Sequence, residues 1–85
     1  MAFYQILYWQ DIPSQIKVWD DFDEIKIEMP PKFMVKIDSE AKAQGLVDED
    51  SYLNQWRWSE EQERLGTVEE VAETVKKELE LKFNT

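Results

Sequence analysis

Hydrophobic and polar residues alternate with a period of two through the first third of the chain. Residues 3–10 are rich in aromatic and branched side chains, and 11–14 contain turn-forming residues, so we predict a strand followed by a turn. Neither face of this strand is plainly polar, and we expect it to be covered on one side and at least partly on the other. Residues 15–19 and 24–29 alternate with lysine and glutamate, as half-buried strands do. The acidic bend 20–23 is expected to connect them.

The period changes after the pair Pro30-Pro31, and two helices are predicted beyond it. A stripe of residues at spacings of three and four predicts the first helix. It consists of Phe33, Met34, Ile37, Ala41 and Gln44. Proline suits the first position of this helix. Gly45 is expected to end it in a left-handed conformation, with Leu46 folding back. Thr67 and Glu70 have the spacing of a capping box at a second helix start. Its apolar stripe comprises Val68, Val71, Ala72, Val75, Leu79 and Phe83.

The segment between the helices is expected to supply one more strand. Residues 48–51 form a polar connector, and 52–58 alternate as a strand does. A short helix capped by Asp50 or Ser51 is the alternative, and the charged residues 60–64 would extend the strand as an exposed arm. The resulting order βββαβα predicts a single α+β domain over residues 1–85. We expect a two-layer sandwich, with a mostly antiparallel sheet of about four strands and two helices on one face.

Charge and composition narrow the classes of function. The chain has 19 acidic and 10 basic residues and a net charge of −9, which argues against nucleic acid or an anionic membrane as partner. It has no histidine and no cysteine, so an imidazole base, a thiol nucleophile, a disulfide and a nitrogen or sulfur metal site are excluded. No segment approaches an apolar run of about 20 residues, and the start lacks the basic region of a signal peptide. We expect a cytoplasmic protein with no cofactor.

The abundant carboxylates are the main candidates for chemistry. Asp20, Asp21, Asp23 and Glu24 lie within five residues, and paired carboxylates can work as acid and base when one pKa is raised. Charges in a bend are usually solvated, however, and the glycine of a calcium loop is missing. We therefore expect no independent catalysis, and a hydrolase that uses this bend is the less favoured alternative.

Aromatic residues are more numerous than a thin core under two helices needs. Eleven of the 85 residues are aromatic, and four are tryptophan. Tryptophan, tyrosine and arginine dominate the energetic centres of protein interfaces, and an exposed aromatic patch marks a partner. We predict a partner-binding surface made of Tyr4, Tyr8, Trp9, Trp19, Tyr52, Trp56, Arg57 and Trp58. Small domains also fill their cores with tryptophan, so a core position for Trp9 or Trp56 stays open.

The distribution of charge indicates the kind of partner. Residues 1–47 carry −3, from eight acids and five bases, and residues 48–85 carry −6, from eleven acids and five bases. A partner docking near the later strand should therefore present an apolar groove with a basic rim. A homodimer formed through the same aromatic face is an alternative.

Several phrases spread over nearly the whole chain resemble a small bacterial family named virulence factor. They are Ile6-Leu7-Tyr8-Trp9-Gln10-Asp11-Ile12-Pro13, Val18-Trp19, Met29-Pro30 with Phe33, Ile37-Asp38, Tyr52-Leu53 with Trp56, Gly66, Val71-Ala72 and Glu78-Leu79. The resemblance implies a short free-standing protein, or a domain like the one appended to the HEAT-repeat protein conserved virulence factor C. It carries over no catalytic residues.

We therefore expect a non-catalytic interaction domain that docks through its aromatic surface. The resemblance also implies an alternative, because free-standing members are associated with gene neighbourhoods for corrinoid or folate one-carbon methyl transfer. In that role the chain would be a small accessory subunit beside a methyltransferase or a methylenetetrahydrofolate reductase.

Overall fold

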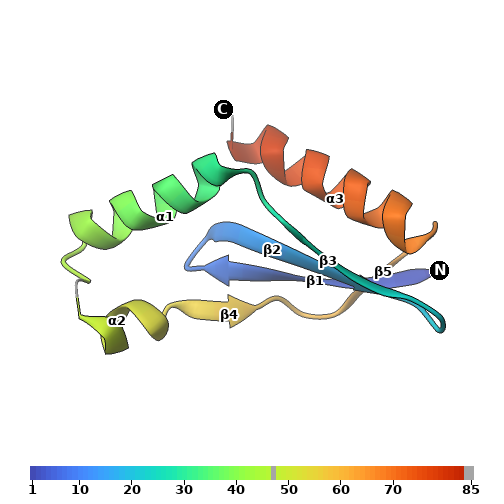
Figure 1. The fold of residues 1–85 in the computed structure, drawn as a ribbon, viewed down its shortest axis with the longest axis horizontal. Helices are drawn as coiled ribbons and strands as arrows, with labels where there is room; N and C mark the ends of the chain where they lie inside the picture. The colour runs from blue at the N-terminus through green and yellow to red at the C-terminus, as the bar shows by residue number, and fades with distance from the viewer. Residues whose placement is uncertain (47, 84–85) are drawn as a thin grey trace.

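The computed structural model describes residues 1–46 and 48–83, which form an antiparallel sheet and three helices (Figure 1). Five strands and three helices follow one another in the order βββααββα, so the predicted α+β class is confirmed. Figure 1 shows α1 and α3 along one side of the sheet. The elements are β1 (Ala2–Trp9), β2 (Ile12–Trp19), β3 (Glu24–Glu28), α1 (Pro31–Ala43), α2 (Glu49–Leu53), β4 (Trp56–Trp58), β5 (Gln62–Arg64) and α3 (Val68–Phe83).

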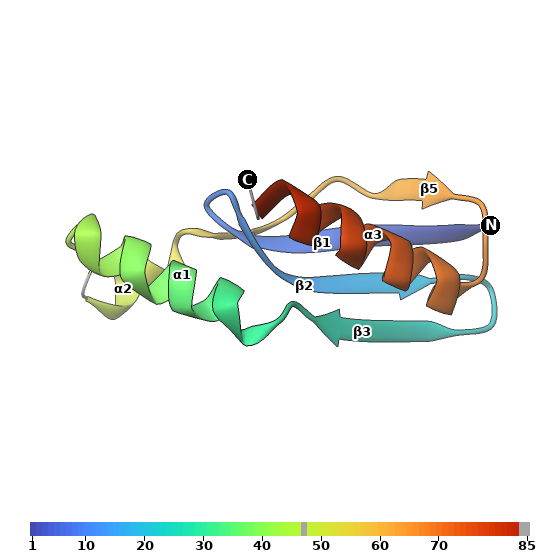
Figure 2. The ribbon, with the colours of Figure 1, turned by 90° about the horizontal axis from the view of Figure 1, so that it is seen from above.

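The sheet has the order β3-β2-β1, and β4 and β5 share the remaining edge of β1 (Figure 2). Strands β1 and β2 are joined by a tight turn at Gln10, whose φ is +54°. The predicted turn at 11–14 is wrong, because β2 already begins at Ile12. Pairing reaches Leu7–Gln15, skips Ser14 and resumes at Tyr8–Pro13. This irregularity accommodates a proline inside the strand.

Strands β4 and β5 act as one edge strand that is interrupted at Ser59. The Ile6 amide donates to Ser59 Oγ at 2.9 Å, and the Ser59 amide donates to the Ile6 carbonyl at 2.8 Å. The side chain of Ser59 therefore replaces a backbone acceptor at the break. The prediction that residues 60–64 extend outward as an exposed arm is wrong, because β5 continues the sheet by pairing with residues 2–4 of β1.

The predicted strand over 52–58 is half wrong, because its first part is helical. Helix α2 ends at Leu53, and only residues 56–58 form a strand. The alternative of a short helix is confirmed, but Asp48 caps it in place of Asp50 or Ser51. The Ser51 amide and hydroxyl both donate to Asp48 Oδ2, at 3.3 and 3.0 Å, which satisfies a free donor in the first turn.

The ends of the two long helices follow the sequence signals. The Thr67 amide donates to Glu70 Oε1 and the Glu70 amide donates to Thr67 Oγ1, both at 3.2 Å, so the capping box is confirmed. Gly45 has φ +73°, and the Leu46 amide folds back onto the Ala41 carbonyl at 2.9 Å, as predicted for the end of α1.

The main core lies between α1, α3 and one face of the sheet. Alternate residues of β1 and β2 point into it, and the inner stripes of α1 and α3 complete it; the members include Tyr4, Ile6, Ile16, Val18, Phe33, Ile37, Val71, Val75 and Leu79. The stripe predicted for α1 is correct at Phe33, Ile37 and Ala41, but Met34 is 46% exposed and Gln44 is exposed at the C-terminal cap. Helix α3 crosses above the strands in Figure 2, so it covers one face of the sheet and not the opposite one.

Candidate functional site

The sheet face opposite α3 is covered at one end and bare at the other. Directly opposed residues of antiparallel strands share a face, so the pairs Phe3–Trp19 and Leu7–Trp58 place four large side chains on this side. We call these four residues the open face. Trp58 is 44% exposed and the other three are half-buried, and Figure 1 shows no helix beneath this part of the sheet.

Helix α2 covers the other end of the same face. Trp9 follows Leu7 in the alternation of β1, yet it is fully buried because Tyr52 of α2 packs against it, with ring centroids 5.6 Å apart. The indole N–H of Trp9 donates to the Tyr52 carbonyl at 3.0 Å. Trp56, paired with Trp9 across the strands, meets the Tyr52 ring edge-on at 6.1 Å. The expectation that β1 is partly covered on its second side is thus confirmed.

The open face combines stacked aromatic rings with charged residues at its border. The rings of Phe3 and Trp19 stack with centroids 6.1 Å apart. Lys17 lies over the Trp19 ring at 5.4 Å and forms an ion pair with Glu24 at 3.4 Å. Glu63 of β5 stands opposite Phe3 on the outer edge. The open face is therefore an aromatic surface bordered by carboxylates.

The acidic bend after β2 is held by Asp20. Its carboxylate accepts the backbone N–H groups of Phe22 and Asp23 at 2.8 and 2.7 Å, and these bonds lower the pKa of Asp20. A turn thus forms without glycine, through a local side-chain bond of a kind that aspartate often makes. A general acid needs a raised pKa, and the shift at Asp20 has the opposite direction.

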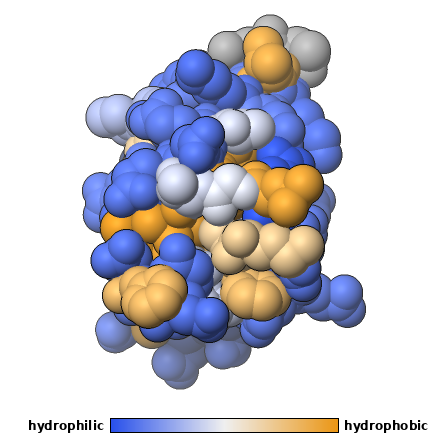
Figure 3. Space-filling model, turned by 90° about the vertical axis from the view of Figure 1, so that its right-hand side faces the viewer, coloured by the Kyte–Doolittle hydropathy of each residue, from blue (hydrophilic) through white to orange (hydrophobic). Residues whose placement is uncertain are grey.

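The same bend exposes an apolar residue at one end of the molecule. Phe22 is 91% exposed, Met1 67% and Leu65 78%. Both ribbon views place the N-terminus, the β2–β3 bend and the β5–α3 connection at this end. Figure 3 looks onto it and shows hydrophobic residues gathered between hydrophilic ones. We call Met1, Phe22 and Leu65 the end patch; it adjoins the Phe3–Trp19 end of the open face.

The structure places two of the eight predicted residues, Trp19 and Trp58, on the open face. Tyr4 lies in the main core. Trp9 and Trp56 pack against Tyr52 of α2 at the covered end of the other face. Buried rings have no surface to offer a partner, so Tyr4 and Trp9 do not belong to a docking surface. Phe3, Leu7 and Phe22 were missed. The alternation of β1 already put Phe3 and Leu7 on one face, but it does not reveal which face α3 covers.

Tyr8 and Arg57 form a separate pair on the α3 side of the sheet edge. They are direct cross-strand partners, and the Arg57 guanidinium lies 5.1 Å from the centre of the Tyr8 ring. Arg57 also forms an ion pair with Asp11 at 3.5 Å. Burial raises the pKa of Tyr8, although the positive charge of Arg57 opposes this shift. Because they lie between the Leu7–Trp58 and Trp9–Trp56 pairs, strand alternation directs both side chains away from the open face.

Two kinds of feature were sought in the described part of the chain: a cluster of metal-ligating side chains and a membrane-spanning helix. Within residues 1–46 and 48–83, no three metal-ligating side chains gather as a cluster that could hold an ion. None of the described helices has the length and apolar character needed to cross a bilayer.

Comparison with known proteins identifies a family and no activity. A family model described as "Virulence factor" matches residues 7–85. No curated protein and no solved structure matches the chain. The match begins inside β1 and runs through all the later elements.

Proposed function

The chain belongs to the virulence factor family, and from this membership together with its surface we propose that it is a non-catalytic interaction domain. It docks onto a partner protein through the open face, formed by Phe3, Leu7, Trp19 and Trp58. The observation that carries this proposal is the bare half of the sheet, where two tryptophans stay accessible beside a helix-covered half.

Exposed aromatic side chains on a rigid sheet suit a protein interface. Tryptophan removes a large apolar area from water when a partner covers it, and it is enriched among the residues that contribute most to binding. The side chains of the open face are held by strand pairing and by the Phe3–Trp19 stack. Little conformational entropy remains to be lost when the partner binds.

The charges around the open face indicate a basic partner. Asp20 and the exposed Asp21, Asp23 and Glu24 lie beside Trp19, and Glu63 lies beside Phe3. Carboxylates at the rim of an interface favour a partner with lysine or arginine around its apolar centre, mainly through faster association. The proposed partner is therefore a protein with an apolar groove and a basic rim.

Affinity purification with matched variants tests this proposal. Tagged native protein, Trp19→Ala, Trp58→Ala and Leu81→Ala are compared, each after circular dichroism has shown an unchanged fold. Leu81 is 71% exposed on α3, so its substitution removes a similar apolar side chain from the opposite layer. A bound protein that is lost with both tryptophan variants and retained with Leu81→Ala supports docking through the open face. Equal retention by all four proteins would refute it.

A second copy of the chain is an alternative occupant of the open face. In that case sedimentation of the purified native protein would show a dimer that Trp58→Ala dissociates. A monomer that binds a different protein through Trp58 instead supports the proposal as stated.

The alternative function, as an accessory subunit of a one-carbon methyl-transfer enzyme, rests on the resemblance alone. It differs from the first proposal in the identity of the partner and in its effect on a rate. Co-purification with such an enzyme, and a changed methyl-transfer rate when the small protein is added back, would favour it. An unchanged rate would count against it.

A further inference from the structure

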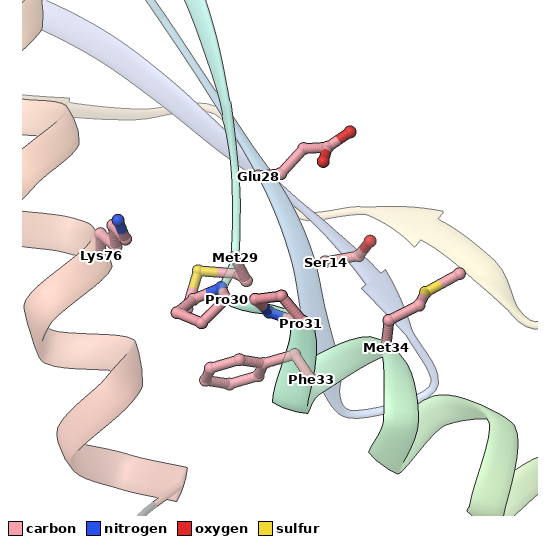
Figure 4. Close-up of a pocket in the computed structure, with 8 residues that line it drawn as sticks. All are labelled: Ser14, Glu28, Met29, Pro30, Pro31, Phe33, Met34 and Lys76. Carbon is pink, nitrogen blue, oxygen red and sulfur yellow. The ribbon is translucent and has the colours of Figure 1, made fainter.

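A second feature of the molecule lies on the helical side and has no part in the proposed docking. A cavity of about 720 Å³ opens where the ends of β2 and β3, the first turn of α1 and the middle of α3 meet (Figure 4). Methionine, proline and phenylalanine supply most of its wall: Met29, Pro30, Pro31, Phe33 and Met34. Cavities of about this volume with mostly apolar walls are typical of small-molecule sites.

Lys76 provides the positive charge of this cavity. It comes from α3, it is half-buried, and no described residue forms an ion pair with it. Figure 4 shows Met29, Pro30 and Phe33 on the side that faces α3 and Lys76, whereas the Glu28 carboxylate points away from Lys76. A lysine ammonium without a counter-charge gains free energy when an anion binds beside it.

Further lysines extend the positive region. Lys32 and Lys36 line a neighbouring cavity of about 230 Å³ on α1, together with Phe33 and Phe83. Phe33 lies in the walls of both cavities, so they adjoin at this ring. Lysines from two helices thus surround an apolar centre in a chain whose net charge is −9. Lys36 also forms an ion pair with Glu40 at 3.1 Å, so the charge offered to an anion in the first cavity is that of Lys76.

We propose that this cavity binds a small organic acid, a carboxylate joined to an apolar chain. The apolar part lies against the accessible Pro30 and Pro31, over the buried Met29 and Phe33, and the carboxylate lies within reach of the Lys76 ammonium. When such a ligand binds, it buries apolar surface of the cavity wall, and its carboxylate supplies the counter-charge that Lys76 lacks. This site is separate from the open face, because none of Phe3, Leu7, Trp19 and Trp58 lines the cavity.

The three methionines of the chain allow a direct test by NMR. Protein labelled with ¹³C at the methionine methyl groups has three signals, from Met1, Met29 and Met34. Titration with octanoate is expected to shift the signals of Met29 and Met34 in a saturable way, whereas Met1, in the end patch, stays in place. Octylamine has the same chain length with the opposite charge, and it is expected to bind at least roughly fivefold more weakly.

Two charge variants distinguish binding at the proposed site from nonspecific hydrophobic binding. Lys76→Gln is expected to weaken octanoate binding by roughly fivefold or more, and Lys77→Gln, at the next position and exposed, leaves it unchanged. Neither position contributes to the buried core, so both variants should fold, as unchanged circular dichroism spectra will show. A parallel titration with the peptide Ala-Ala-Leu distinguishes the two sources of such a carboxylate, a free acid and a peptide end. Tighter binding of octanoate supports the free acid.

Three results would overturn the proposal. They are octylamine binding as tightly as octanoate, Lys76→Gln leaving the affinity unchanged, and Met1 shifting in parallel with Met29. In each case the contact would be an apolar one without a carboxylate site. A failure here leaves the docking proposal untouched, since Trp19 and Trp58 are not part of this cavity.

Discussion

Replacing single tryptophans with phenylalanine tests how the structure divides the aromatic residues. Trp9 is fully buried under α2, and Trp58 is 44% exposed on the open face. Both belong to the same side of the sheet, two strand positions apart in the pairing with β1. The same substitution at the two positions should therefore have very different effects on stability.

The expected loss at Trp9 follows from its contacts. Phenylalanine removes the hydrogen bond from the indole N–H to the Tyr52 carbonyl, which is worth about 1 kcal/mol. It also removes part of a ring that packs against Tyr52 and leaves a small cavity, at a further cost of about 1–2 kcal/mol. The free energy of unfolding should fall by about 2–3 kcal/mol in Trp9→Phe, against less than about 0.5 kcal/mol in Trp58→Phe.

Urea denaturation followed by circular dichroism measures both values. A chain of this length is expected to have an m value of about 1–1.5 kcal/mol/M, so the midpoint of Trp9→Phe should fall by about 2 M. The midpoint of Trp58→Phe should move by less than about 0.4 M. Equal losses in the two variants would mean that α2 does not seal one end of this face. The assignment of Trp58 to a free surface would then fail with it.

Three further predictions concern the local devices that hold the helices. Thr67→Ala removes the capping-box hydroxyl and should lower the free energy of unfolding in urea by about 1 kcal/mol. The control Thr74→Ala, at an exposed position in the middle of α3, should change the same free energy by only about 0.3 kcal/mol. Gly45→Ala places a side chain at φ +73°, where it would meet no atom within 4 Å, so a loss of about 1 kcal/mol should come from the backbone alone. Arg64 holds the pKa of Glu78 below its ordinary value of 4.5 through two hydrogen bonds. The stabilisation is therefore present above about pH 4.5 and lost as the pH falls through the lowered native pKa. Glu78→Gln should cost about 0.5 kcal/mol at pH 7 in this exposed pair, and thermal unfolding at pH 3 should show a smaller difference; an equal difference at both pH values would contradict this account.

Local patterns were enough to predict the long elements. The capping box at Thr67 and Glu70 and the left-handed Gly45 each depend on residues a few positions apart. Alternation in residues 3–10 and 15–19 identified two strands for the same reason. Short elements escaped such reading, because residues 49–53 and 56–58 contain too few positions to establish a period.

The candidate site could be predicted only in part. Composition indicated an aromatic surface, and two of the named residues, Trp19 and Trp58, lie on one. Trp9 and Trp58 stand in similar aromatic strands with the same alternation, so the chain gives no local sign of which one is buried. The difference comes from Tyr52, 43 residues after Trp9, which packs on its ring.

By itself, the sequence determined the first three strands, the two long helices, the α+β class and the family. These features depend on propensity, hydrogen-bond capping and the order of residues, which act over short stretches of chain. Only the tertiary structure decided which side of the sheet α3 covers, how much of the opposite side α2 covers, and that Lys76 lies beside an apolar cavity wall. Burial is a property of packing between distant segments. It therefore separates the tryptophans of the core from those that a partner can reach.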